Sequence, residues 1–317
     1  MHFKLTILGS SSAVPTSHRN LTAHALRVHE RFFLIDCGEG TQMQLRKNKV
    51  PLGRIHNIFI THLHGDHIFG LYGLISSYNL LYRKEDLHIY APEELQDILG
   101  YHLRIFEPHL HYKIVYHVLS TTEKALVYED KHLEVYSFPL FHKVPTFGFL
   151  FQEKPYERNL KKQVIKQLAI PIGHLKSIKR GDDWITESGM RIPNRQLTIP
   201  PYKARSFAYC SDTLYAPSLT RFFPNVDLLF HEATFGSDFK KQARLTTHST
   251  AAQAAQMALK ADVQKLLIGH FSARHKHVGP LLEEARAIFP NTYIADDGLT
   301  FSIPLIRETE DQEPLNA

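Results

Sequence analysis

His62-Leu63-His64-Gly65-Asp66-His67 follows the apolar segment Ile58-Phe59-Ile60 and carries four metal-ligand side chains within six residues. Imidazole and carboxylate groups together suit zinc and its first-row neighbours, and a loop at the end of a buried strand holds such ligands rigidly. One ion needs about four ligands. Because His62 and His64 form one set and Asp66 and His67 another, the spacing anticipates two ions.

The alternative interpretation is a polar loop in a histidine-rich chain, because 21 of the 317 residues are histidine. That background makes any single histidine a weak indication of a metal site. A strand followed by His-x-His-x-Asp-His is much rarer by chance, and Gly65 supplies the tight turn that returns Asp66 to the site. The stretch therefore indicates a metal centre.

Length and composition indicate one large domain with an excursion, since 317 residues with 43% apolar content suffice for a sizeable α/β core. Cys37 and Cys210 lie far apart without a Cys-x-x-Cys pair, which argues against a disulfide framework or a thiolate zinc site. No stretch reaches about 18 uninterrupted apolar residues, and the first apolar run is too short for a signal sequence. We therefore expect a soluble protein in a reducing compartment, the cytoplasm.

The net charge of +5 permits a polyanionic partner without requiring one. Positive charge is concentrated between Lys154 and Arg180, where eight basic residues accompany Glu157 alone, a local net charge of +7. A solvated charged insert is the general alternative for such a cluster. The candidate RNA-binding residues are Lys154, Arg158, Lys161, Lys162, Lys166, Lys176, Lys179 and Arg180.

Short apolar runs alternate with helical patterns along the chain, which predicts mixed α/β architecture. The predicted strands are residues 4–8, 32–35, 58–60, 87–90, 133–138, 148–151, 206–209, 228–230, 265–268 and 293–295. The predicted helices are residues 67–80, 93–98, 251–260 and 280–288. Ser249 or Thr250 can cap the third helix, and residues 307–317 are predicted to be a loose C-terminal tail.

Candidate reactive residues recur where the predicted strands end. They are Asp36, the residues from His62 to His67, His142, Asp212, His231, Glu232 and His270. Ligands bind at strand ends in open sheets that are covered by helices, so these residues are expected to share one sheet edge. For Asp36, Asp296 and Asp297, a role as turn carboxylates stays open.

Several further motifs accompany the His62–His67 run. They are Gly9-Ser10-Ser11-Ser12-Ala13-Val14-Pro15, Asp36-Cys37-Gly38-Glu39-Gly40-Thr41, His142-Lys143-Val144-Pro145-Thr146-Phe147-Gly148-Phe149, Cys210-Ser211-Asp212-Thr213, His231-Glu232-Ala233-Thr234-Phe235, Thr247-His248-Ser249-Thr250 and Gly269-His270-Phe271-Ser272-Ala273-Arg274. With these motifs the chain resembles the metallo-β-lactamase superfamily over nearly its whole length. Within that superfamily it resembles the ribonuclease Z family of tRNA 3′-processing endonucleases.

The resemblance implies a four-layer αββα sandwich, the metallo-β-lactamase fold, with a protruding basic arm. It implies one catalytic domain over residues 1–306, which includes a tRNA-binding arm, or exosite, at residues 152–183. It also implies two Zn²⁺ ions per subunit with a bridging hydroxide. Carried onto this chain, the metal ligands are His62, His64 and His142 for one ion, Asp66, His67 and His270 for the other, and Asp212 for both.

The implied reaction is phosphodiester hydrolysis that removes the 3′ trailer of precursor tRNA and leaves a 3′-hydroxyl on the tRNA. Asp66 would accept or orient the proton of the attacking water. His248 would protonate the leaving oxygen, and Glu232 would hold the other ring nitrogen of His248. Without the family match, the less favoured alternative for His248 is a histidine at a helix entry beside Ser249.

Two departures from the family pattern concern the substrate. Family arms often carry Gly-Pro at the tip, whereas here His174 follows Gly173, so the conformation of the arm is open. Many members carry Pro-x-Lys-x-Arg-Asn near the active site, but this chain has Ser17 in the lysine position. That difference leaves open where the chain cuts relative to CCA and whether CCA inhibits it.

The family also implies a homodimer.

Two other functions compete with this interpretation. A small-molecule phosphodiesterase or another metallo-hydrolase of the same superfamily, such as a lactonase-like enzyme, would share the metal ligands but would not need an arm with a charge of +7. A non-catalytic RNA-binding protein could retain the fold, although such a protein has no physical reason to keep the ligand set together with Glu232 and His248.

Overall fold

A computed structural model describes residues 1–119 and 123–309. The chain divides into two compact units, one formed by Met1–Gln152 with Ser206–Ile303 and the other by Glu153–Arg205 with the segment that starts at Pro304. Within the described residues, no helix has the length and apolar character needed to cross a bilayer. The predicted mixed α/β architecture is confirmed, with two large sheets in the first unit.

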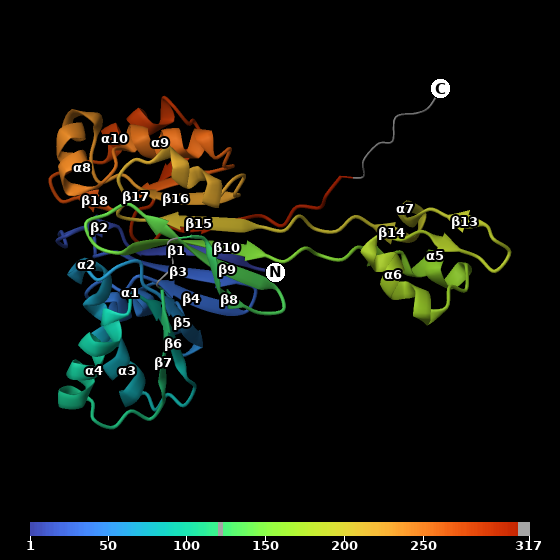
Figure 1. The fold of residues 1–317 in the computed structure, drawn as a ribbon, viewed down its shortest axis with the longest axis horizontal. Helices are drawn as coiled ribbons and strands as arrows, with labels where there is room; N and C mark the ends of the chain where they lie inside the picture. The colour runs from blue at the N-terminus through green and yellow to red at the C-terminus, as the bar shows by residue number, and fades with distance from the viewer. Residues whose placement is uncertain (120–122, 310–317) are drawn as a thin grey trace. The chain divides into compact units, whose positions relative to one another are not determined.

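The first sheet has the strand order β20-β1-β3-β4-β5-β6-β7 (Figure 1). Its strands are β1 (Phe3–Gly9), β3 (Ala23–Val28), β4 (Arg31–Ile35), β5 (Ile55–Phe59), β6 (Leu87–Ala91), β7 (Ile114–Val118) and β20 (Thr300–Ser302). Strands β4 to β7 are parallel, whereas β20, β1, β3 and β4 pair antiparallel. The parallel part brings the carboxyl ends of β4 and β5, with Asp36 and His62 just beyond them, to one edge.

The second sheet has the order β19-β17-β16-β15-β10-β9-β8. Its strands are β8 (Ala125–Glu129), β9 (Leu133–Leu140), β10 (Thr146–Glu153), β15 (Ser206–Cys210), β16 (Leu228–Glu232), β17 (Leu266–Gly269) and β19 (Thr292–Ile294). Strands β15, β16, β17 and β19 run parallel. Asp212, Glu232 and His270 therefore follow or end neighbouring strands at one edge.

Helices cover the outer face of each sheet, so the first unit has four layers (Figure 1). The helices on the first sheet are α1 (Thr41–Lys47), α2 (Gly65–Ile68), α3 (Gly70–Leu80) and α4 (Glu94–Phe106), with the 3-10 turn η1 (Leu52–Arg54). Those on the second sheet are η3 (Pro217–Phe222), η4 (Ser237–Phe239), α8 (Lys240–Thr246), α9 (Ala251–Lys260) and α10 (Gly279–Arg286). The short strands β2 (Ser11–Ser12) and β18 (Phe271–Ser272) pair with each other. The predicted αββα arrangement is confirmed.

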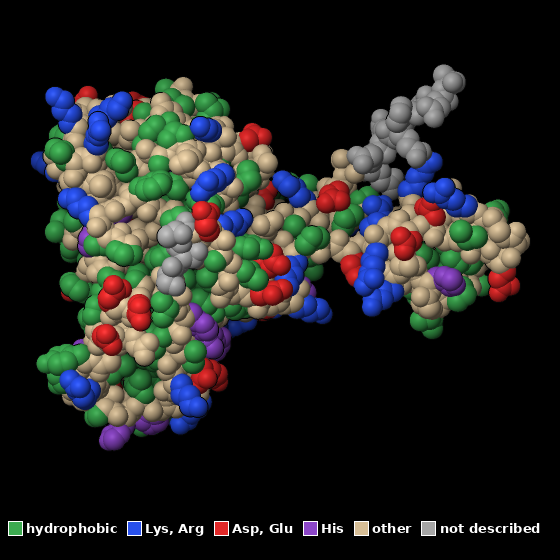
Figure 2. Space-filling model, in the orientation of Figure 1, with side chains coloured by type: hydrophobic (Ala, Val, Ile, Leu, Met, Phe, Trp, Pro, Cys, Tyr) green, Lys and Arg blue, Asp and Glu red, His purple; other side chains and the backbone are tan. Residues whose placement is uncertain are grey.

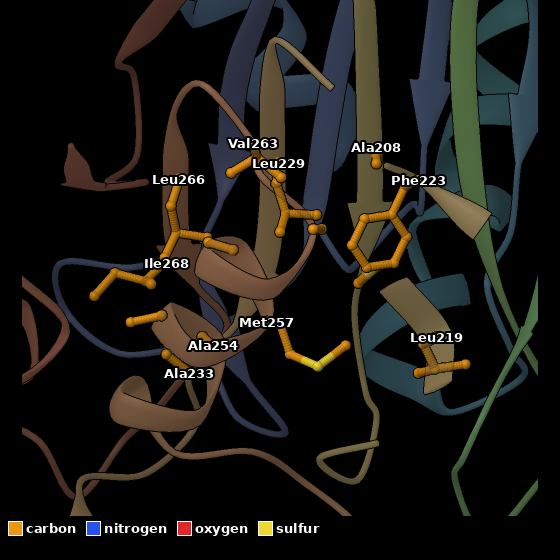
Figure 3. Close-up of a cluster of buried hydrophobic side chains, with 14 of the residues drawn as sticks. Ala208, Leu219, Phe223, Leu229, Ala233, Ala254, Met257, Val263, Leu266 and Ile268 are labelled. Carbon is orange, nitrogen blue, oxygen red and sulfur yellow. The ribbon is translucent and has the colours of Figure 1, made fainter. Parts of the chain in front are cut away.

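Three apolar clusters hold the layers together. Between the sheets, the rings of Phe59, Phe149 and Phe151 pack at centroid distances of 5.2–5.3 Å. Each of these side chains is fully buried, which contributes about 1.5–3 kcal/mol per residue. Figure 3 shows the cluster under α9, where Met257 of that helix and Leu229 of β16 point into the same core. Side chains of the strands as well as those of the helices are therefore buried in these clusters. Their packing fixes the position of the sheets and of the loops at the sheet edge.

The predicted elements agree with the structure to different degrees. Helix α9 has the predicted bounds, and Thr250 closes a capping box with Gln253 at its start. The predicted helix at 67–80 is divided at Phe69 into α2 and α3, and α4 continues to Phe106 instead of ending at residue 98. Strands β3, β7 and β8 were not predicted, because they carry mixed polar and apolar residues without a clean alternation.

The second unit contains the short elements of the expected arm. They are β11 (Asn159–Leu160), α5 (Lys162–Gln167), η2 (Ile172–His174), α6 (Leu175–Arg180), β12 (Trp184–Ile185), β13 (Arg191–Ile192), α7 (Asn194–Leu197) and β14 (Thr198–Ile199). Buried side chains of Ile170, Ile178, Ile192 and Leu197 form its core. The unit extends to Arg205, whereas the range expected from the sequence ended at residue 183. Part of the expected loose tail, residues 310–317, lies outside the described residues.

One ion pair, one β-bridge and one hydrogen bond hold the ends of this second unit. Arg205 donates to the carboxylate of Glu153 at 2.7 and 2.9 Å, and both side chains are buried. Arg307, in the segment expected to be a loose tail, bridges to Tyr202 and donates to the carbonyl of Pro200. Residues 304–309 therefore contact the unit, so the tail is not loose from its first residue.

Candidate metal centre

Seven candidate ligands from five places in the chain meet at the strand edge of the first unit. His62 and His64 lie in the segment that leaves β5, Asp66 and His67 lie in α2, and His142 lies between β9 and β10. The remaining two, Asp212 and His270, follow β15 and β17. The parallel strands end at the same level, so side chains distant in sequence converge.

The first cluster consists of His62, His64, His142 and Asp212, whose potential ligand atoms all lie within 4.8 Å of one another. His62 Nε2 lies 2.9 Å from His64 Nδ1 and 3.6 Å from Asp212 Oδ2. His142 Nε2 lies 3.8 Å from the same oxygen of Asp212. Three imidazoles and one carboxylate oxygen make a donor set that suits one zinc ion.

The second cluster consists of Asp66, His67 and His270. The Nε2 atoms of His67 and His270 are 3.3 Å apart, and Asp66 Oδ2 lies 3.6 and 3.7 Å from them. Asp212 Oδ1 lies 3.3 Å from His67 Nε2 and 3.1 Å from His270 Nε2. The two oxygens of Asp212 thus face different clusters, which is the arrangement required of a carboxylate shared by two ions.

The hydrogen-bond partners of the histidines fit metal binding. Outward-facing Nδ1 atoms of His62, His67, His142 and His270 contact Thr61, Asp36, Thr247 and Thr234 respectively, at 2.7–3.0 Å. With Nδ1–H donating outwards, each Nε2 presents a lone pair to the cluster. Among the described residues, His142 Nε2 is buried without a hydrogen-bond partner. A buried nitrogen acceptor aimed at other acceptors is what a cation would satisfy.

Burial also keeps the imidazoles available as ligands. Burial and the nearby His67 lower the pKa of His62 well below its ordinary value. Burial likewise lowers the pKa of His142, although the Asp212 carboxylate opposes this change. Neutral imidazole is the form that binds metal, so the environment of His62 and His142 favours the ligand-competent state. For His67, burial lowers the pKa, but the carboxylates of Asp212 and Asp36 outweigh burial and raise the pKa well above its ordinary value, so this ring must lose a proton to bind an ion.

Asp36 is buried behind the second cluster. Its contacts decide between a role in the site and the role of turn carboxylate that the sequence left open. Its carboxylate accepts a hydrogen bond from His67 Nδ1 at 2.9 Å and from Tyr209 Oη at 3.2 Å. The backbone N–H of Thr61 donates to its other oxygen at 2.8 Å. Asp36 thus orients a candidate ligand, and it does so from a left-handed backbone conformation with φ of 56°. Asp212 and His270 also have positive φ, at 36° and 58°.

Replacing Asp36 with asparagine is expected to lower the affinity for zinc about 10- to 100-fold, because the amide accepts the His67 proton less strongly. Titration of metal-free protein with zinc in the presence of a competing chelator measures this change. Asp262→Asn is the matched control, since Asp262 is exposed, also has positive φ at 51°, and lies outside the clusters. Equal affinities of the two variants would contradict the orienting role of Asp36.

His248 and Glu232 form a pair beside the clusters. His248 Nδ1–H donates to Glu232 Oε1 at 2.9 Å and lies 4.0 Å from Asp212 Oδ2. The backbone N–H of Thr213 and the hydroxyl of Thr234 also donate to the buried Glu232 carboxylate, at 2.8 and 2.6 Å. Burial lowers the pKa of His248, but the charge and hydrogen bond of Glu232 outweigh it and raise the pKa to about 9. The ring can therefore carry a proton near neutral pH.

Asp66 has a further contact outside its cluster. The backbone N–H of Ala13, whose φ is 60°, donates to Asp66 Oδ2 at 2.8 Å. Burial raises the pKa of Asp66, yet the neighbouring His67 and His270 outweigh burial and hold it below its ordinary value. Asp66 is thus an ionised carboxylate that faces both the cluster and the loop at residues 13–20.

Asp296 and Asp297 fix that loop and do not join the clusters. Asp297 accepts from Ser10 Oγ at 2.7 Å and from the backbone N–H of Asn20 at 2.7 Å. Asp296 pairs with Arg19 at 3.1 Å. Both carboxylates therefore hold this loop and lie outside the two clusters of candidate ligands.

A cavity of about 640 Å³ opens over the metal ligands. Its lining includes His64, Asp66, His142, Asp212 and His248, together with Phe69, Lys143 and Glu39. Neither Phe69 nor Lys143 was identified from the sequence as a site residue. Lys143 follows His142 directly and Phe69 lies two residues after His67, so proximity in sequence to predicted ligands was the signal that could have found them.

Comparisons with known proteins agree with this geometry. Residues 3–138 match a family model described as the anti-Pycsar protein Apyc1. A protein named ribonuclease Z from Bacteroides thetaiotaomicron is 45% identical to this chain, and the match covers 99% of each chain. A protein of the same name from Synechocystis is 41% identical, and the match covers 97% of this chain and 96% of that protein. Crystalline human tRNase Z, short form, superposes with a TM-score of 0.70 at 27% identity, covering 95% of this chain and 99% of that one. YhfI from Bacillus subtilis, a metallo-β-lactamase fold protein, has a TM-score of 0.67 at 17% identity over 95% and 100% of the two chains, which shows the fold alone.

Proposed function

Since this chain belongs to the ribonuclease Z family, we propose that it is a metal-dependent endoribonuclease that removes the 3′ trailer from precursor tRNA by phosphodiester hydrolysis and leaves a 3′-hydroxyl on the tRNA. One observation carries this proposal beyond the family name. The two oxygens of Asp212 face two separate histidine clusters, and His248, which is paired with the buried Glu232, lines the same open cavity as Asp212. Metal binding and proton donation thus have their groups at a single site.

The ligand assignment follows from the two clusters. We propose that His62, His64 and His142 hold one zinc ion, that Asp66, His67 and His270 hold the other, and that Asp212 binds both. When bound, two divalent ions activate water for nucleophilic attack near neutral pH and offset the negative charge of the phosphoryl group. Zinc is favoured by the imidazole-rich donor set.

The protein's own groups supply the proton transfers. Asp66 borders the cavity, so its carboxylate can orient the attacking water and accept its proton. His248, held by Glu232, can donate a proton to the departing ribose 3′-oxygen, which is a strongly basic leaving group. The in-line geometry of displacement requires the proton donor and the proton acceptor on different sides of the phosphate. Asp66 lies in α2, which follows β5 of the first sheet, whereas His248 lies between α8 and α9, which cover the second sheet.

The test of the proposed function is cleavage of precursor tRNAs that carry 3′ trailers, with and without CCA, followed by mapping of the cut. We expect one cut that leaves a 3′-hydroxyl on the tRNA, and the loss of this cut on removal of metal by a chelator with recovery on addition of zinc. The comparison with CCA shows where the protein cuts relative to CCA and whether CCA inhibits it. Hydrolysis of a small diester without any cleavage of precursor tRNA would replace this proposal with a small-molecule phosphodiesterase.

We propose that the second unit binds the tRNA backbone. Figure 2 shows lysine and arginine side chains on its surface. Of the eight candidate residues, Lys162, Lys166, Lys176 and Arg180 are exposed. Arg158 and Lys161 instead donate to Thr198 Oγ1 and the Arg195 carbonyl at 2.7 Å, and Lys179 lies 3.9 Å from Glu157. The exposed four are therefore the better candidates for phosphate binding.

Changing the exposed four residues to glutamine together is expected to weaken tRNA binding and to flatten its salt dependence. The log–log slope of affinity against salt should fall by roughly 0.7–0.9 for each phosphate that these side chains neutralise in the unchanged protein. Hydrolysis of a small diester should keep its rate, because the metal ligands are untouched. Binding titrations at several salt concentrations measure both effects.

A control with the same charge change separates specific binding from net charge. Glutamine at the exposed Lys47, Lys84, Lys131 and Lys260 of the first unit removes four charges elsewhere. An equal decrease of affinity in the two quadruple variants would overturn the assignment of the second unit to tRNA binding.

We further propose a homodimer in the cytoplasm. Exposed apolar side chains of Leu80, Tyr101, Ile105 and Phe106 on or near α3 and α4 support self-association, since such side chains on neighbouring helices favour a protein contact. Cys37 and Cys210 are free and buried, which supports a reducing compartment. Light scattering of the protein in solution tests the dimer by its mass.

A further inference from the structure

Phe69 is an exposed aromatic side chain at the edge of the metal centre. It follows α2 directly, two residues after the candidate ligand His67, and 55% of its surface is exposed. Its neighbours Ile68 and Leu71 are buried in the core between the first sheet and its helices. Phe69 thus points away from the core that its neighbours build, and the packing of the fold does not account for it.

The ring is held in place by the ligand loop. A Cβ at residue 65 would lie 2.4 Å from Phe69 Cε2, so the ring rests against the backbone of Gly65. The backbone N–H of Phe69 donates to the Gly65 carbonyl at 2.9 Å. A ring fixed in this way loses little conformational freedom when it binds a ligand, and its exposed part faces solvent.

The cavity over the metal centre contains this ring. Phe69 lines it together with the ligands His64 and Asp66 and with the ammonium-bearing Lys143. The same space therefore offers a metal cluster and a cation for phosphate oxygens, and an aromatic face beside them. An RNA strand bound there has alternating phosphates and bases, so a phosphodiester at the clusters brings its neighbouring bases into the same cavity.

We propose that Phe69 is a stacking platform for one of the two nucleobases that flank the scissile phosphodiester. This inference rests on the proposed ribonuclease function. Stacking on an aromatic ring accepts every base, because each base has a π-face, and it positions the strand without selecting its sequence. The partner of Phe69 is thus a single-stranded nucleobase, and its contribution is to hold the adjacent phosphate at the metal centre.

The test pairs variants of Phe69 with precursor tRNAs that lack one base, at the position before or after the cut. We expect Phe69→Leu to lower kcat/KM about 5- to 100-fold on the intact substrate, mainly through KM. On the abasic substrate at the stacked position, Phe69→Leu and the unchanged protein should cleave at similar rates. Phe69→Trp should restore cleavage of the intact substrate, because leucine is apolar without a π-face whereas tryptophan has a larger one.

Phe141→Leu is the matched control, since Phe141 is 50% exposed and adjacent to the ligand His142. It is not among the residues that line the cavity. Its effect on kcat/KM should be the same for intact and abasic substrates. Metal content measured for each variant shows whether the ligand loop is intact, and Phe69→Leu should retain the metal content of the unchanged protein.

Two results would overturn the inference. The first is an equal effect of Phe69→Leu on the intact substrate and on both abasic substrates, and the second is a failure of Phe69→Trp to restore cleavage while metal content is unchanged. Failure of the proposed function looks different, because the unchanged protein would then not cleave intact precursor tRNA at all.

Discussion

Replacement of Asp212 with asparagine is expected to reduce cleavage of precursor tRNA by about 10³-fold or more and to lower the metal content below two ions per chain. The physical reason is the shared carboxylate, whose Oδ2 lies 3.6 Å from His62 Nε2 and whose Oδ1 lies 3.1 Å from His270 Nε2. An amide has one oxygen and no negative charge, so it cannot serve both clusters. Each tenfold decrease in rate corresponds to about 1.36 kcal/mol of activation free energy. The expected decrease in rate therefore equals the loss of several kcal/mol of charge stabilisation.

Steady-state cleavage and elemental analysis measure the two parts of this prediction. Asp262→Asn makes the same chemical change at an exposed aspartate that also has positive φ, and it should retain activity and metal. Full activity with two bound ions in Asp212→Asn would show that the two clusters do not depend on a common carboxylate.

Replacement of His248 with alanine is expected to lower kcat about 10²- to 10⁴-fold while both metal ions stay bound, because this residue contributes a proton and not a ligand. The hydrogen bond from His248 Nδ1 to Glu232 at 2.9 Å leaves the other ring nitrogen for the leaving oxygen. Single-turnover cleavage by the metal-loaded variant measures the effect.

A sulfur substitution separates proton donation from structural damage. A substrate in which sulfur replaces the leaving 3′-oxygen departs as a thiolate, and a thiol has a pKa near 8.5, so its departure needs little help from an acid. His248→Ala should therefore cleave this substrate at nearly the rate of the unchanged protein. An equal reduction on the oxygen and sulfur substrates would rule out the role of acid, and His109→Ala, at an exposed histidine, serves as a control without effect on either.

The local part of the site could be predicted because it is encoded in short motifs. His62, His64, Asp66 and His67 lie within six residues, so their proximity needs only a strand followed by a turn. The helix α9 was predicted with its bounds for the same reason, since its capping residues and apolar spacing are local. Strands β3, β7 and β8 were not predicted, because their short sequences lack a clean alternation of polar and apolar residues.

The hydrogen bonds behind the ligands could not be predicted in the same way. Thr61, Thr234 and Thr247 each bind the Nδ1 of a candidate ligand, and two of them bind a histidine far away in the chain. A threonine beside a histidine is too common to mark such a role. The bounds of the second unit were missed for a related reason, since the buried pair of Glu153 and Arg205 joins residues 52 positions apart.

The sequence by itself determined which residue types are available to bind metal and to move protons, the α/β class, and the family, because motifs and hydrophobic periodicity are properties of neighbouring residues. Only the tertiary structure decided that Asp212 turns one oxygen to each cluster, that Asp36 and the threonines orient the imidazoles, and that Phe69 stands exposed over the cavity. Those features depend on the parallel strands ending at one edge and on the packing of two sheets against each other. Such interactions join parts of the chain that no local pattern connects.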